Sequence, residues 1–417
     1  MKILLWSQCF WPEHAHINEV AQSLTEAGHL VTVLTGKPNY PGGEVYAGYR
    51  AWGVQEESHE GMDIVRVPIL PRGKGRALGL VKNYLSFIAT GGLIAPLVLR
   101  KRQFDVVFVY APSPILQTLP ALWIARLRGI PLVLWVQDLW PEALVSTGFV
   151  RNRWLLRGVG LVVRHIYRRS DLLLIPSQAF LNSVTSHGCA PEKVVYHPNS
   201  AGQRPPVQKL SDSTRQLVQD VGGQFSVVYA GNLGTVQSLD TVISTAYALR
   251  AHTGLRFYLI GSGSMAIRLE QAIANEGLSN ITLHRWVASD EIQAVYAAAS
   301  VLLVPLKDDA QIGHTIPNKM QVYLATGKPI IVSSNGEVAR ILQLAKAGVC
   351  CPAGDAEALA EAVLQLQAMS DVERKVLGDN GRAFFQLHFE LGLTTKKLEG
   401  LLEGMVNKFS SQSRRKV

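Results

Sequence analysis

Two glycine-containing turns in the second half of the chain have the composition of an anion site. One apolar run ends in Gly231-Asn232-Leu233-Gly234, and another ends in Gly261-Ser262-Gly263. Glycine lets a backbone approach an anion, and a helix that follows such a turn offers free N–H groups and a positive dipole end. The spacing is not the dinucleotide-binding fingerprint, because no glycine stands at position 233. The turns predict either a phosphate cradle or ordinary strand-to-helix turns.

A third segment places a cation beside several hydrogen-bond donors. Pro317 suits the first turn of a helix that stops at Gly327. The start of this helix carries four side chains that can bind a diphosphate: His314, Thr315, Asn318 and Lys319. The positive charge of a lysine is unfavourable at a helix N-terminus, which is the positive end of the macrodipole. Helix stability therefore does not explain Lys319, and a bound anion would. We therefore favour an anion site over a capped surface helix.

Two loops in the first half combine carboxylates with aromatic rings. Trp11-Pro12-Glu13 and Trp140-Pro141-Glu142 each follow a predicted strand. Loops after parallel strands face the ligand side of a sheet, and carboxylates with rings suit a sugar. Glu13 and Asp138 can each orient an acceptor hydroxyl or take its proton, and His16 lies in the first loop. The alternative for each carboxylate is a helix cap.

The whole chain of 417 residues has a formal net charge of +9 and a pI near 9.4. Clusters of basic residues lie in its first half. The basic positions are Arg72, Lys74, Arg76, Lys82, residues 100–102, and Arg153, Arg157, Arg164 and Arg168 on one face of a predicted helix. Basic residues that flank apolar ones fit an anionic membrane surface, and a solvated helix face is the alternative. Nucleic acid fits less well, because no helix-turn-helix, zinc or single-strand-binding motif appears.

The composition excludes several protein classes. An apolar fraction of 47% with 18% charged residues is globular and not disordered. The four cysteines are too few for a disulfide framework or a zinc site, which favours a reducing compartment. The start of the chain is too short an apolar run for a secretory signal. The longest uncharged run, 83–99, is short of the roughly 20 residues of a spanning helix, so it either spans a membrane or lies on one.

Short apolar runs, which we read as strands, alternate along the chain with amphipathic stretches, which we read as helices. These elements must position the candidate site residues. The predicted strands are 3–6, 30–34, 64–67, 106–109, 132–136 and 172–175, then 225–229, 256–260, 281–284, 301–304, 330–332 and 348–350. Strands that are apolar throughout belong to parallel sheets covered by helices. The predicted fold is therefore α/β, with two doubly wound, Rossmann-like domains facing a cleft. We expect domains at 1–200 and 225–384, a polar linker at 201–224, and a helix with a basic tail at 385–417.

The ordered set of motifs resembles the family 4 glycosyltransferases over nearly the whole chain. The N-terminal matches are Phe10-Trp11-Pro12-Glu13, Pro38-Asn39-Tyr40-Pro41-Gly42 and Gln137-Asp138-Leu139-Trp140-Pro141-Glu142. The C-terminal matches are the two glycine turns, Pro317-Asn318-Lys319 and Ala325-Thr326-Gly327-Lys328-Pro329. The most similar branch builds bacterial surface polysaccharides, such as capsule and O-antigen, and includes enzymes assigned as L-fucosamine transferases.

This resemblance implies a GT-B fold, a nucleotide-sugar donor on the C-terminal domain, retention of anomeric configuration and no metal or other cofactor. It also implies that the last helix, near 372–405, returns to the first domain, and that backbone around Arg285 and Val287 meets the nucleobase. Two departures stand out. Where the wider family has two glutamates, this chain has His314 and Val322, and the neighbouring Gln321 is the substitute for the second. Where the family has a basic residue after the glycine turn, this chain has Thr235-Val236-Gln237.

The sequence thus predicts a peripheral membrane glycosyltransferase on the cytoplasmic face, acting on a UDP-type donor sugar, such as an N-acetylated deoxyamino sugar, and a polyprenyl-diphosphate-linked acceptor. The predicted catalytic residues are Asp138, His314 and Glu13. The predicted donor-binding residues are Gly231, Asn232, Gly234, Gly261, Arg285, Val287, Thr315, Asn318, Lys319 and Gln321. The predicted acceptor-binding residues are His14, His16, Asn39, Tyr40, Trp140 and Glu142. The alternatives are a UDP-sugar 2-epimerase of the same fold and a membrane-bound scaffold without catalysis.

Overall fold

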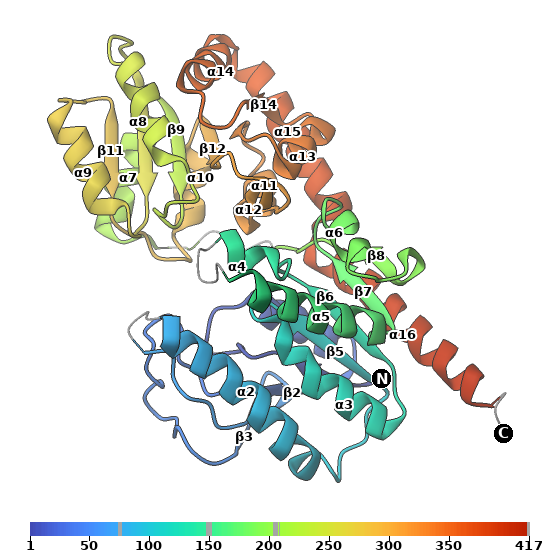
Figure 1. The fold of residues 1–417 in the computed structure, drawn as a ribbon. Coiled ribbons are helices and arrows are strands. Elements are labelled where there is room, and N and C mark those ends of the chain that lie inside the picture. Colours follow the sequence, from blue (N-terminus) through green and yellow to red (C-terminus); the bar gives the residue numbers. More distant parts are fainter. Residues whose placement is uncertain (74–76, 147–151, 203–206, 208, 415–417) are drawn as a thin grey trace. The chain divides into compact units, whose positions relative to one another are not determined.

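The chain forms two compact units in the computed structural model, which describes residues 1–73, 77–146, 152–202, 207 and 209–414 (Figure 1). One unit is Met1–Pro198 together with Leu391–Val417, and the other is Asn199–Glu390. The chain thus leaves the first unit after Pro198 and returns to it at Leu391. The sequence predicted the end of the first domain at residue 200 and the start of the returning helix at residue 385. Lys74, Arg76, most of the Pro-rich part of the expected linker and the last three residues of the basic tail lie outside the described residues.

The first unit contains an eight-stranded sheet with the order β3-β4-β2-β1-β5-β6-β7-β8. The strands are β1 (Lys2–Trp6), β2 (Leu30–Thr35), β3 (Gln55–His59), β4 (Met62–Arg66), β5 (Val106–Ala111), β6 (Leu132–Val136), β7 (Leu172–Ile175) and β8 (Val194–Tyr196). All neighbours are parallel except β3, which runs antiparallel to β4 at the edge. Alternate residues of a strand feed two separate cores, because both faces of the sheet are covered. In β1, Leu4 and Trp6 lie in one core, and Ile3 and Leu5 lie in the other.

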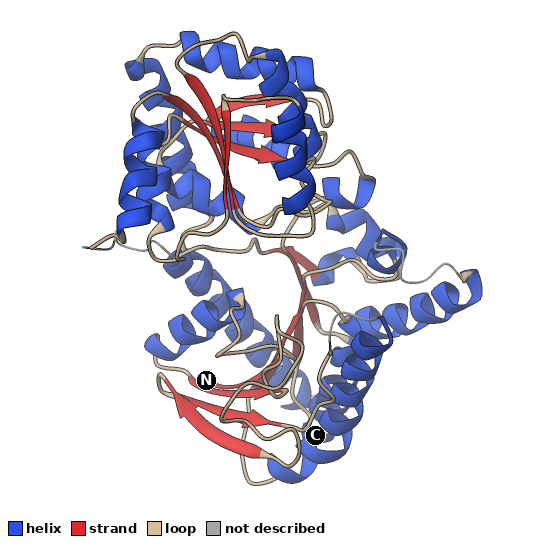
Figure 2. Cartoon of the chain, turned by 90° about the vertical axis from the view of Figure 1, so that its left-hand side faces the viewer, coloured by secondary structure: helices blue, strands red, loops and turns tan. Residues whose placement is uncertain are grey.

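Seven α-helices belong to this unit among the described residues: α1 (His16–Glu26), α2 (Ala77–Val98), α3 (Thr118–Arg128), α4 (Glu142–Ser146), α5 (Arg153–Arg169), α6 (Phe180–Ser186) and α16 (Leu391–Arg414). Helices α2, α3 and α5 pack on one face of the sheet, and α1 and α16 pack on the other. Figure 1 labels α2, α3 and α5, and Figure 2 shows helices on both sides of the strands. Leu398 and Leu402 of α16 are fully buried against α1 and the sheet, and His29 Nε2 contacts Glu399 Oε1 at 2.9 Å.

The second unit contains a six-stranded, all-parallel sheet with the order β11-β10-β9-β12-β13-β14. The strands are β9 (Phe225–Ala230), β10 (Leu255–Ile260), β11 (Ile281–His284), β12 (Val301–Pro305), β13 (Ile330–Ser333) and β14 (Gly348–Cys351). The helices are α7 (Asp212–Gly222), α8 (Leu239–Ala248), α9 (Ala266–Asn275), α10 (Ile292–Ala298), α11 (Ala310–Gly313), α12 (Asn318–Thr326), α13 (Glu337–Ala345), α14 (Ala356–Ala368) and α15 (Asp371–His388). The predicted α/β architecture is confirmed for both units.

Two predictions of organisation were wrong. The expected linker at 201–224 includes α7, whose residues Thr214, Leu217 and Val221 are buried at helical spacing in the second unit. The single helix expected over about 372–405 is two helices, α15 and α16, which meet at Phe389 and Glu390. The break there separates the helix that packs in the second unit from the helix that packs in the first.

The turns after β9 and β10 pack directly on each other. Gly261 has a φ of +144°, and a Cβ placed on it would lie 1.9 Å from the carbonyl oxygen of Gly231. The Gly231 N–H donates to the Ile260 carbonyl at 2.9 Å, and the Leu233 N–H donates to the Ser262 carbonyl at 2.8 Å. The glycine at 261 is therefore required by a close approach of two backbones.

Replacing Gly261 with alanine should destabilise the second unit by about 2–3 kcal/mol, because the new Cβ combines a clash with a strained φ. Thermal unfolding followed by circular dichroism measures the change. The matched control is Gly254→Ala, since Gly254 also has a positive φ, +80°, but nothing lies within 4 Å of its added Cβ. Equal losses for the two variants would contradict the close-approach argument.

Candidate functional site

The carboxyl ends of β9 and β12 mark the point at which the strand order of the second unit changes direction. β9 pairs with β10 on one side and with β12 on the other. In an open parallel sheet such a point leaves room for a ligand outside the strand ends. The Gly231 turn follows β9 here, and the segment that leads to α12 follows β12. These two segments hold most of the residues predicted to bind a donor.

Lys319 lies against the Gly231 turn. Its Nζ is 3.8 Å from the centre of the Tyr229 ring, is 3.0 Å from a Cβ placed on Gly231 and donates to Gln237 Oε1 at 3.3 Å. Within the described part of the chain, no carboxylate oxygen lies within 4 Å of Nζ. Burial lowers the pKa of Lys319 to about 7. The ammonium is therefore partly desolvated and lacks a counter-ion, which is the electrostatic setting that an anion would complete.

Gln237 belongs to the Thr235-Val236-Gln237 segment, where the resemblance implies a basic residue. Its side chain turns toward Lys319 and accepts a hydrogen bond from it. Tyr229 supports the same turn, because its Oη donates to the Asn232 carbonyl at 2.6 Å. The sequence did not single out either residue as part of the site. The sequence predicted Tyr229 only as the last residue of a strand. Its contact with Lys319 joins positions that are ninety residues apart, so no local pattern indicates it.

The other predicted donor residues of the glycine turns differ in access. Gly231 and Asn232 are exposed, and Gly261 is half-buried. Gly234 is buried, and a Cβ there would lie 2.7 Å from Nδ2 of Asn232, which covers it. Gly234 therefore shapes the turn and does not present its backbone to a ligand.

The first turn of α12 presents some of its polar side chains and buries others. Asn318 is exposed, and the Thr315 hydroxyl donates to the Ile312 carbonyl at 2.9 Å. Gln321 is 1% exposed, and in the orientation that satisfies its amide the nitrogen donates to the Pro317 and Asn318 carbonyls at 3.0 Å each. The prediction that Gln321 binds donor is therefore wrong for this structure, because its amide closes the helix start. Val322 packs against the core.

His314 lines a cavity of about 200 Å³ at the carboxyl ends of β12 and β13. Its Nδ1 is buried and has no hydrogen-bond partner among the described residues. The other lining residues are Lys307, Asp308, Asp309, Ala310, Gly313, Ser334, Asn335 and Gly336. Asp308 Oδ1 accepts from Asn335 Nδ2 at 3.1 Å, and Asp309 caps α11 through the N–H groups of Gln311 and Ile312. The cavity thus offers both acceptors and donors to a polyhydroxylated ligand.

Sequence reasoning missed the Asp308, Asp309 and Asn335 side chains of this cavity. Asn335 follows β13, so its contact with Asp308 depends on the pairing of β12 with β13. These residues could have been found from the rule that loops after adjacent parallel strands meet at the carboxyl ends of those strands.

The loop after β11 combines an exposed ring with a basic residue. Trp286 is 66% exposed, and Arg285 Nη2 contacts Glu270 Oε1 of α9 at 3.2 Å. The Val287 side chain is 7% exposed and belongs to the core, so only its backbone is available. The backbone carbonyl of His284, at the end of β11, accepts a hydrogen bond from the Gly261 N–H at 2.9 Å. This loop therefore adjoins the second glycine turn.

In the first unit, Asp138 is the most accessible of the predicted catalytic carboxylates. Its Oδ2 accepts from the Ser113 N–H at 3.0 Å and from the Ser113 hydroxyl at 2.7 Å. Trp140 Nε1 donates to the same hydroxyl at 3.1 Å. Asp138 is half-buried, and its Oδ1 has no hydrogen-bond partner among the described residues. One oxygen is therefore fixed while the other remains able to accept from a ligand hydroxyl.

Glu13 and Asn39 hold a loop together, which corrects their predicted roles. Glu13 is 2% exposed, and its Oε1 accepts from the N–H groups of Asn39 and Tyr40 at 2.6 and 2.7 Å. Asn39 is buried, and its amide donates to the Lys37 carbonyl at 2.9 Å. Neither side chain is presented to an acceptor in this structure, because both satisfy buried backbone groups. Glu13 is also not the helix cap that the sequence offered as an alternative.

The remaining predicted acceptor residues lie at different depths. His14 is exposed, and Tyr40 is half-exposed with the Arg72 guanidinium 5.0 Å from its ring. His16 packs edge-on against Trp135 at 5.4 Å, and Trp135 packs against His197 at 4.8 Å. Burial, and then the neighbouring His16, lowers the pKa of His197 to about 3.

Two of the predicted acceptor residues support the Asp138 loop. Trp140 is buried and donates to Ser113, so it positions that serine and is not available as a stacking surface. Glu142 Oε1 accepts from the Ser183 hydroxyl at 2.8 Å. The Trp140 ring is therefore not presented to an acceptor, whereas Glu142 Oε2 has no hydrogen-bond partner among the described residues, so the role of Glu142 stays a prediction.

Two domain families match the two units in order. Residues 14–200 match the glycosyl transferase 4-like domain, and residues 224–369 match the glycosyl transferases of group 1. The chain is a glycosyltransferase. This membership confirms the resemblance that the sequence motifs carried, and it fits a second unit whose strand ends gather glycine turns, a lysine and a polar cavity.

The relatives of this glycosyltransferase include enzymes of bacterial polysaccharide assembly. It is 27% identical over 357 residues to WcaI of Escherichia coli K12, a glycosyl transferase assigned to colanic acid biosynthesis, covering 80% of this chain and 83% of that protein. It is 25% identical over 244 residues to the amylovoran biosynthesis glycosyltransferase AmsK of Erwinia amylovora, covering 57% of each chain.

Solved structures confirm that this glycosyltransferase has the GT-B fold. The sucrose-phosphate synthase of Thermosynechococcus elongatus matches 98% of this chain and 99% of its own, with a TM-score of 0.72 and 18% identity. The Anabaena protein HepE in complex with UDP matches 97% of this chain and 100% of its own, with a TM-score of 0.69 and 15% identity.

Proposed function

We propose that the chain transfers a sugar from a UDP-sugar to a polyprenyl-diphosphate-linked acceptor in bacterial polysaccharide assembly, with retention of configuration and without a metal ion. The placement of Lys319 against the Gly231 turn carries this proposal. A partly desolvated cation, with no carboxylate partner among the described residues, supplies the positive charge that a departing diphosphate requires. The relatives named for colanic acid and amylovoran biosynthesis support the polysaccharide, and the UDP complex of HepE supports the nucleotide.

The donor sugar fits the cavity beside His314. A volume of about 200 Å³ with carboxylate, amide and imidazole groups suits a single hexose ring whose hydroxyls need both donors and acceptors. In this assignment the diphosphate lies at Lys319 and the Gly231 turn, and the nucleobase lies near Trp286. On the acceptor side, Asp138 orients a hydroxyl through the oxygen that Ser113 leaves open.

Turnover of a panel of UDP-sugars tests the proposal, with UDP-N-acetylated amino sugars first. The assay contains EDTA and a synthetic polyprenyl-diphosphate-linked sugar, and NMR of the product reads its anomeric configuration. We expect UDP release that depends on the acceptor and a product with the configuration of the donor. Donor conversion in the absence of acceptor would instead identify a UDP-sugar 2-epimerase, and loss of turnover on adding EDTA would overturn metal independence.

An apolar and basic face of the first unit supports a membrane-linked acceptor. Helix α2 presents Leu78, Val81, Leu85, Leu93 and Leu97 as exposed side chains. The neighbouring α3 adds Trp123 and Leu127, and α5 adds Trp154, Leu155 and Leu161. We name these ten residues the apolar face. The sequences of α2, α3 and α5 contain no aspartate or glutamate, while α5 alone carries five arginines.

The inner side of α2 is packed on the sheet, which favours lying on a membrane over crossing it. Phe87 and Ala95 are fully buried, and a Cβ on Gly91 would lie 2.8 Å from the Trp6 ring. Leu78–Val98 has a mean hydropathy of 1.3 and is long and apolar enough to cross a bilayer, but that measure alone is weak. An amphipathic surface that combines leucine and tryptophan with arginine binds anionic interfaces.

Placing charge on the apolar face should release the protein from vesicles. The double variant Leu85→Asp with Leu93→Asp should lower partitioning onto phosphatidylglycerol-containing vesicles about tenfold or more, because carboxylates are repelled by anionic lipid and lose apolar burial. Vesicle co-sedimentation measures this. The control is Leu344→Asp with Leu387→Asp, which changes two leucines of the second unit that are also more than half exposed. Equal binding of both double variants and wild type would contradict the assignment.

A further inference from the structure

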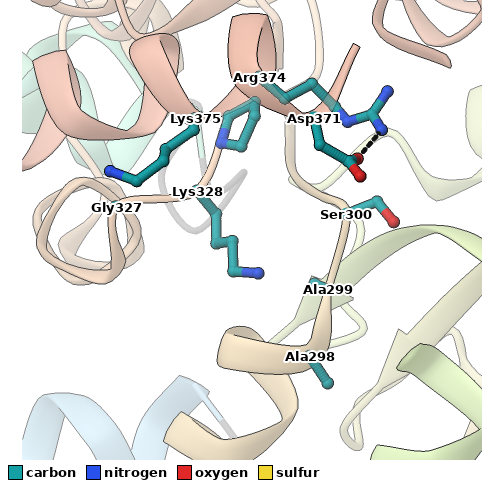
Figure 3. A pocket seen from close by; sticks show the side chains of 9 residues that line it. Ala298, Ala299, Ser300, Gly327, Lys328, Asp371, Arg374 and Lys375 are labelled. Atoms are coloured by element: carbon teal, nitrogen blue, oxygen red, sulfur yellow. Dashed lines mark hydrogen bonds and ion pairs between the residues drawn. The ribbon is translucent and has the colours of Figure 1, made fainter. Parts of the chain in front are cut away.

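A second cavity of the second unit lies at the amino ends of the strands, whereas the Gly231 turn lies at their carboxyl ends. Figure 3 shows the residues that line it. It is bounded by residues 298–300 before β12, residues 327–329 before β13 and the first turn of α15, and its volume is about 320 Å³. Because β12 and β13 are parallel, these are their amino ends. A five-residue strand spans roughly 16 Å. The cavity is therefore separate from the cradle around Lys319 and from the cavity beside His314.

Three cations and one carboxylate line this cavity, and two of the cations are already engaged. The Arg374 guanidinium contacts Asp371 and donates to the Leu366 and Met369 carbonyls at the end of α14. The Lys375 ammonium is paired with Asp379 one turn along α15. Asp371 is almost fully exposed and turns toward Arg374, as Figure 3 shows. The carboxylate therefore compensates Arg374 and leaves the rest of the cavity positive.

Lys328 is the cation that remains. Its side chain extends into the space between the 327–329 segment and residues 298–300 (Figure 3). Among the described residues, Nζ has neither a carboxylate within 4 Å nor a hydrogen-bond acceptor. The residue is half-buried, and burial lowers its pKa. A partly desolvated ammonium without a partner is costly unless an anion accompanies it.

The walls of the cavity are fixed in advance of any ligand. A Cβ on Gly378 of α15 would lie 1.9 Å from the Gly327 carbonyl oxygen, so the two segments meet backbone to backbone. Arg382 Nη2 donates to the Thr326 carbonyl at 2.8 Å. Ser300 is held by reciprocal hydrogen bonds with Ser226 at 3.1 Å, and its O–H proton can still be donated. Little ordering would accompany binding, which favours a true site over an incidental hollow.

We propose that this cavity binds a phosphorylated small molecule at a site distinct from the donor site. Lys328 meets the phosphate, and the Ser300 hydroxyl and the Lys375 ammonium border the remainder of the ligand. The volume exceeds what a bare phosphate fills and lies at the lower end of the range for small-molecule sites, which fits a sugar phosphate. The chemistry assigned is a phosphate monoester on a hydroxylated carrier.

Isothermal titration with glucose 6-phosphate tests this site on the full chain. Wild type should bind, and Lys328→Gln should weaken binding about tenfold or more, because it removes the one cation lining this cavity that has no partner among the described residues. Lys328→Arg should restore binding, which separates loss of charge from misfolding. Lys319→Met, in the other anion site, and Lys396→Gln, an exposed lysine of the first unit, should both leave glucose 6-phosphate binding unchanged.

The remaining results each overturn the proposal. Absence of binding to wild type does so, as does a Lys328→Gln affinity within twofold of wild type. Loss of binding in Lys319→Met would assign the sugar phosphate to the donor cradle. Sulfate that binds as tightly as glucose 6-phosphate would show that the cavity attracts anions without recognising the carrier.

Discussion

Replacing Lys319 with methionine should lower kcat/KM for the UDP-sugar about 10²–10³-fold, because the charge that meets the departing diphosphate is lost. Methionine keeps the length of the side chain and its packing on the Tyr229 ring. The affinity for UDP should fall as well, since the leaving group carries the diphosphate in both the substrate and the product. Steady-state kinetics and calorimetric titration of UDP measure the two effects. Lys209→Met, at an exposed lysine of the same unit, is the matched control.

The pH dependence of UDP binding gives Lys319 a second, independent signature. Its ordinary pKa of 10.5 is lowered to about 7 by burial, so the ligand-free protein loses the ammonium as the pH rises through 7. UDP affinity should therefore decline as the pH rises above 7, and Lys319→Met should not show this decline. Between pH 7 and 10.5 the unfolded chain holds the proton that the folded chain has released, so Lys319 makes stability rise with pH. Equal UDP affinity of wild type and Lys319→Met would contradict the assignment.

Lys319 was predictable from sequence because its signal is local. A lysine in the first turn of a helix is unfavourable by itself, and the helix limits follow from Pro317 and Gly327 only a few residues away. The structure places the helix at Asn318–Thr326, with Gly327 in the left-handed region. Its contacts with Tyr229 and Gln237 depend instead on the order of the strands. They could be expected in general terms only.

Glu13 shows what local reasoning loses. Its neighbours in sequence are those of a ligand loop, but the groups that it accepts from are twenty-six and twenty-seven residues further along the chain. No periodicity or spacing specifies that contact. The same holds for Gln321, whose amide folds back onto carbonyls of its own helix start. In both cases a buried polar group had to be satisfied, and the partner was a backbone group that the residue types do not reveal.

The errors in the fold have a related cause. Among the strands that read as apolar runs, all except β8 were predicted, because burial on two faces leaves a continuous apolar run. Strand β8 has only three residues, Val194–Tyr196, and was missed. Strand β3 reads Gln-Glu-Glu-Ser-His and was missed, since an edge strand with one antiparallel neighbour need not be apolar. Helix α7 was hidden by its polar surroundings, although Leu217 and Val221 are spaced for a helix. The break between α15 and α16, at Phe389 and Glu390, contains neither glycine nor proline, so the sequence did not indicate it.

Asp138→Asn should lower kcat about 10²–10³-fold while leaving UDP affinity unchanged. Asparagine preserves the size of the side chain, and its carbonyl oxygen can still accept from the Ser113 N–H and hydroxyl. What it removes is the negative oxygen that faces away from Ser113 and is able to take or orient the proton of an acceptor hydroxyl. Steady-state kinetics at saturating acceptor, together with titration of UDP, separates this effect from a defect in the donor unit.

Glu13→Gln is the informative companion, because the two carboxylates share a sequence context and differ in structure. Glu13 is buried on two backbone N–H groups, so its loss of charge should lower the melting temperature and leave kcat within about fivefold of wild type once the protein is folded. The kcat of Ser113→Ala should lie between those of Asp138→Asn and Glu13→Gln, since this change removes one of the two hydrogen bonds that fix Asp138. If Glu13→Gln abolishes turnover in a protein as stable as wild type while Asp138→Asn does not, the two assignments must be exchanged.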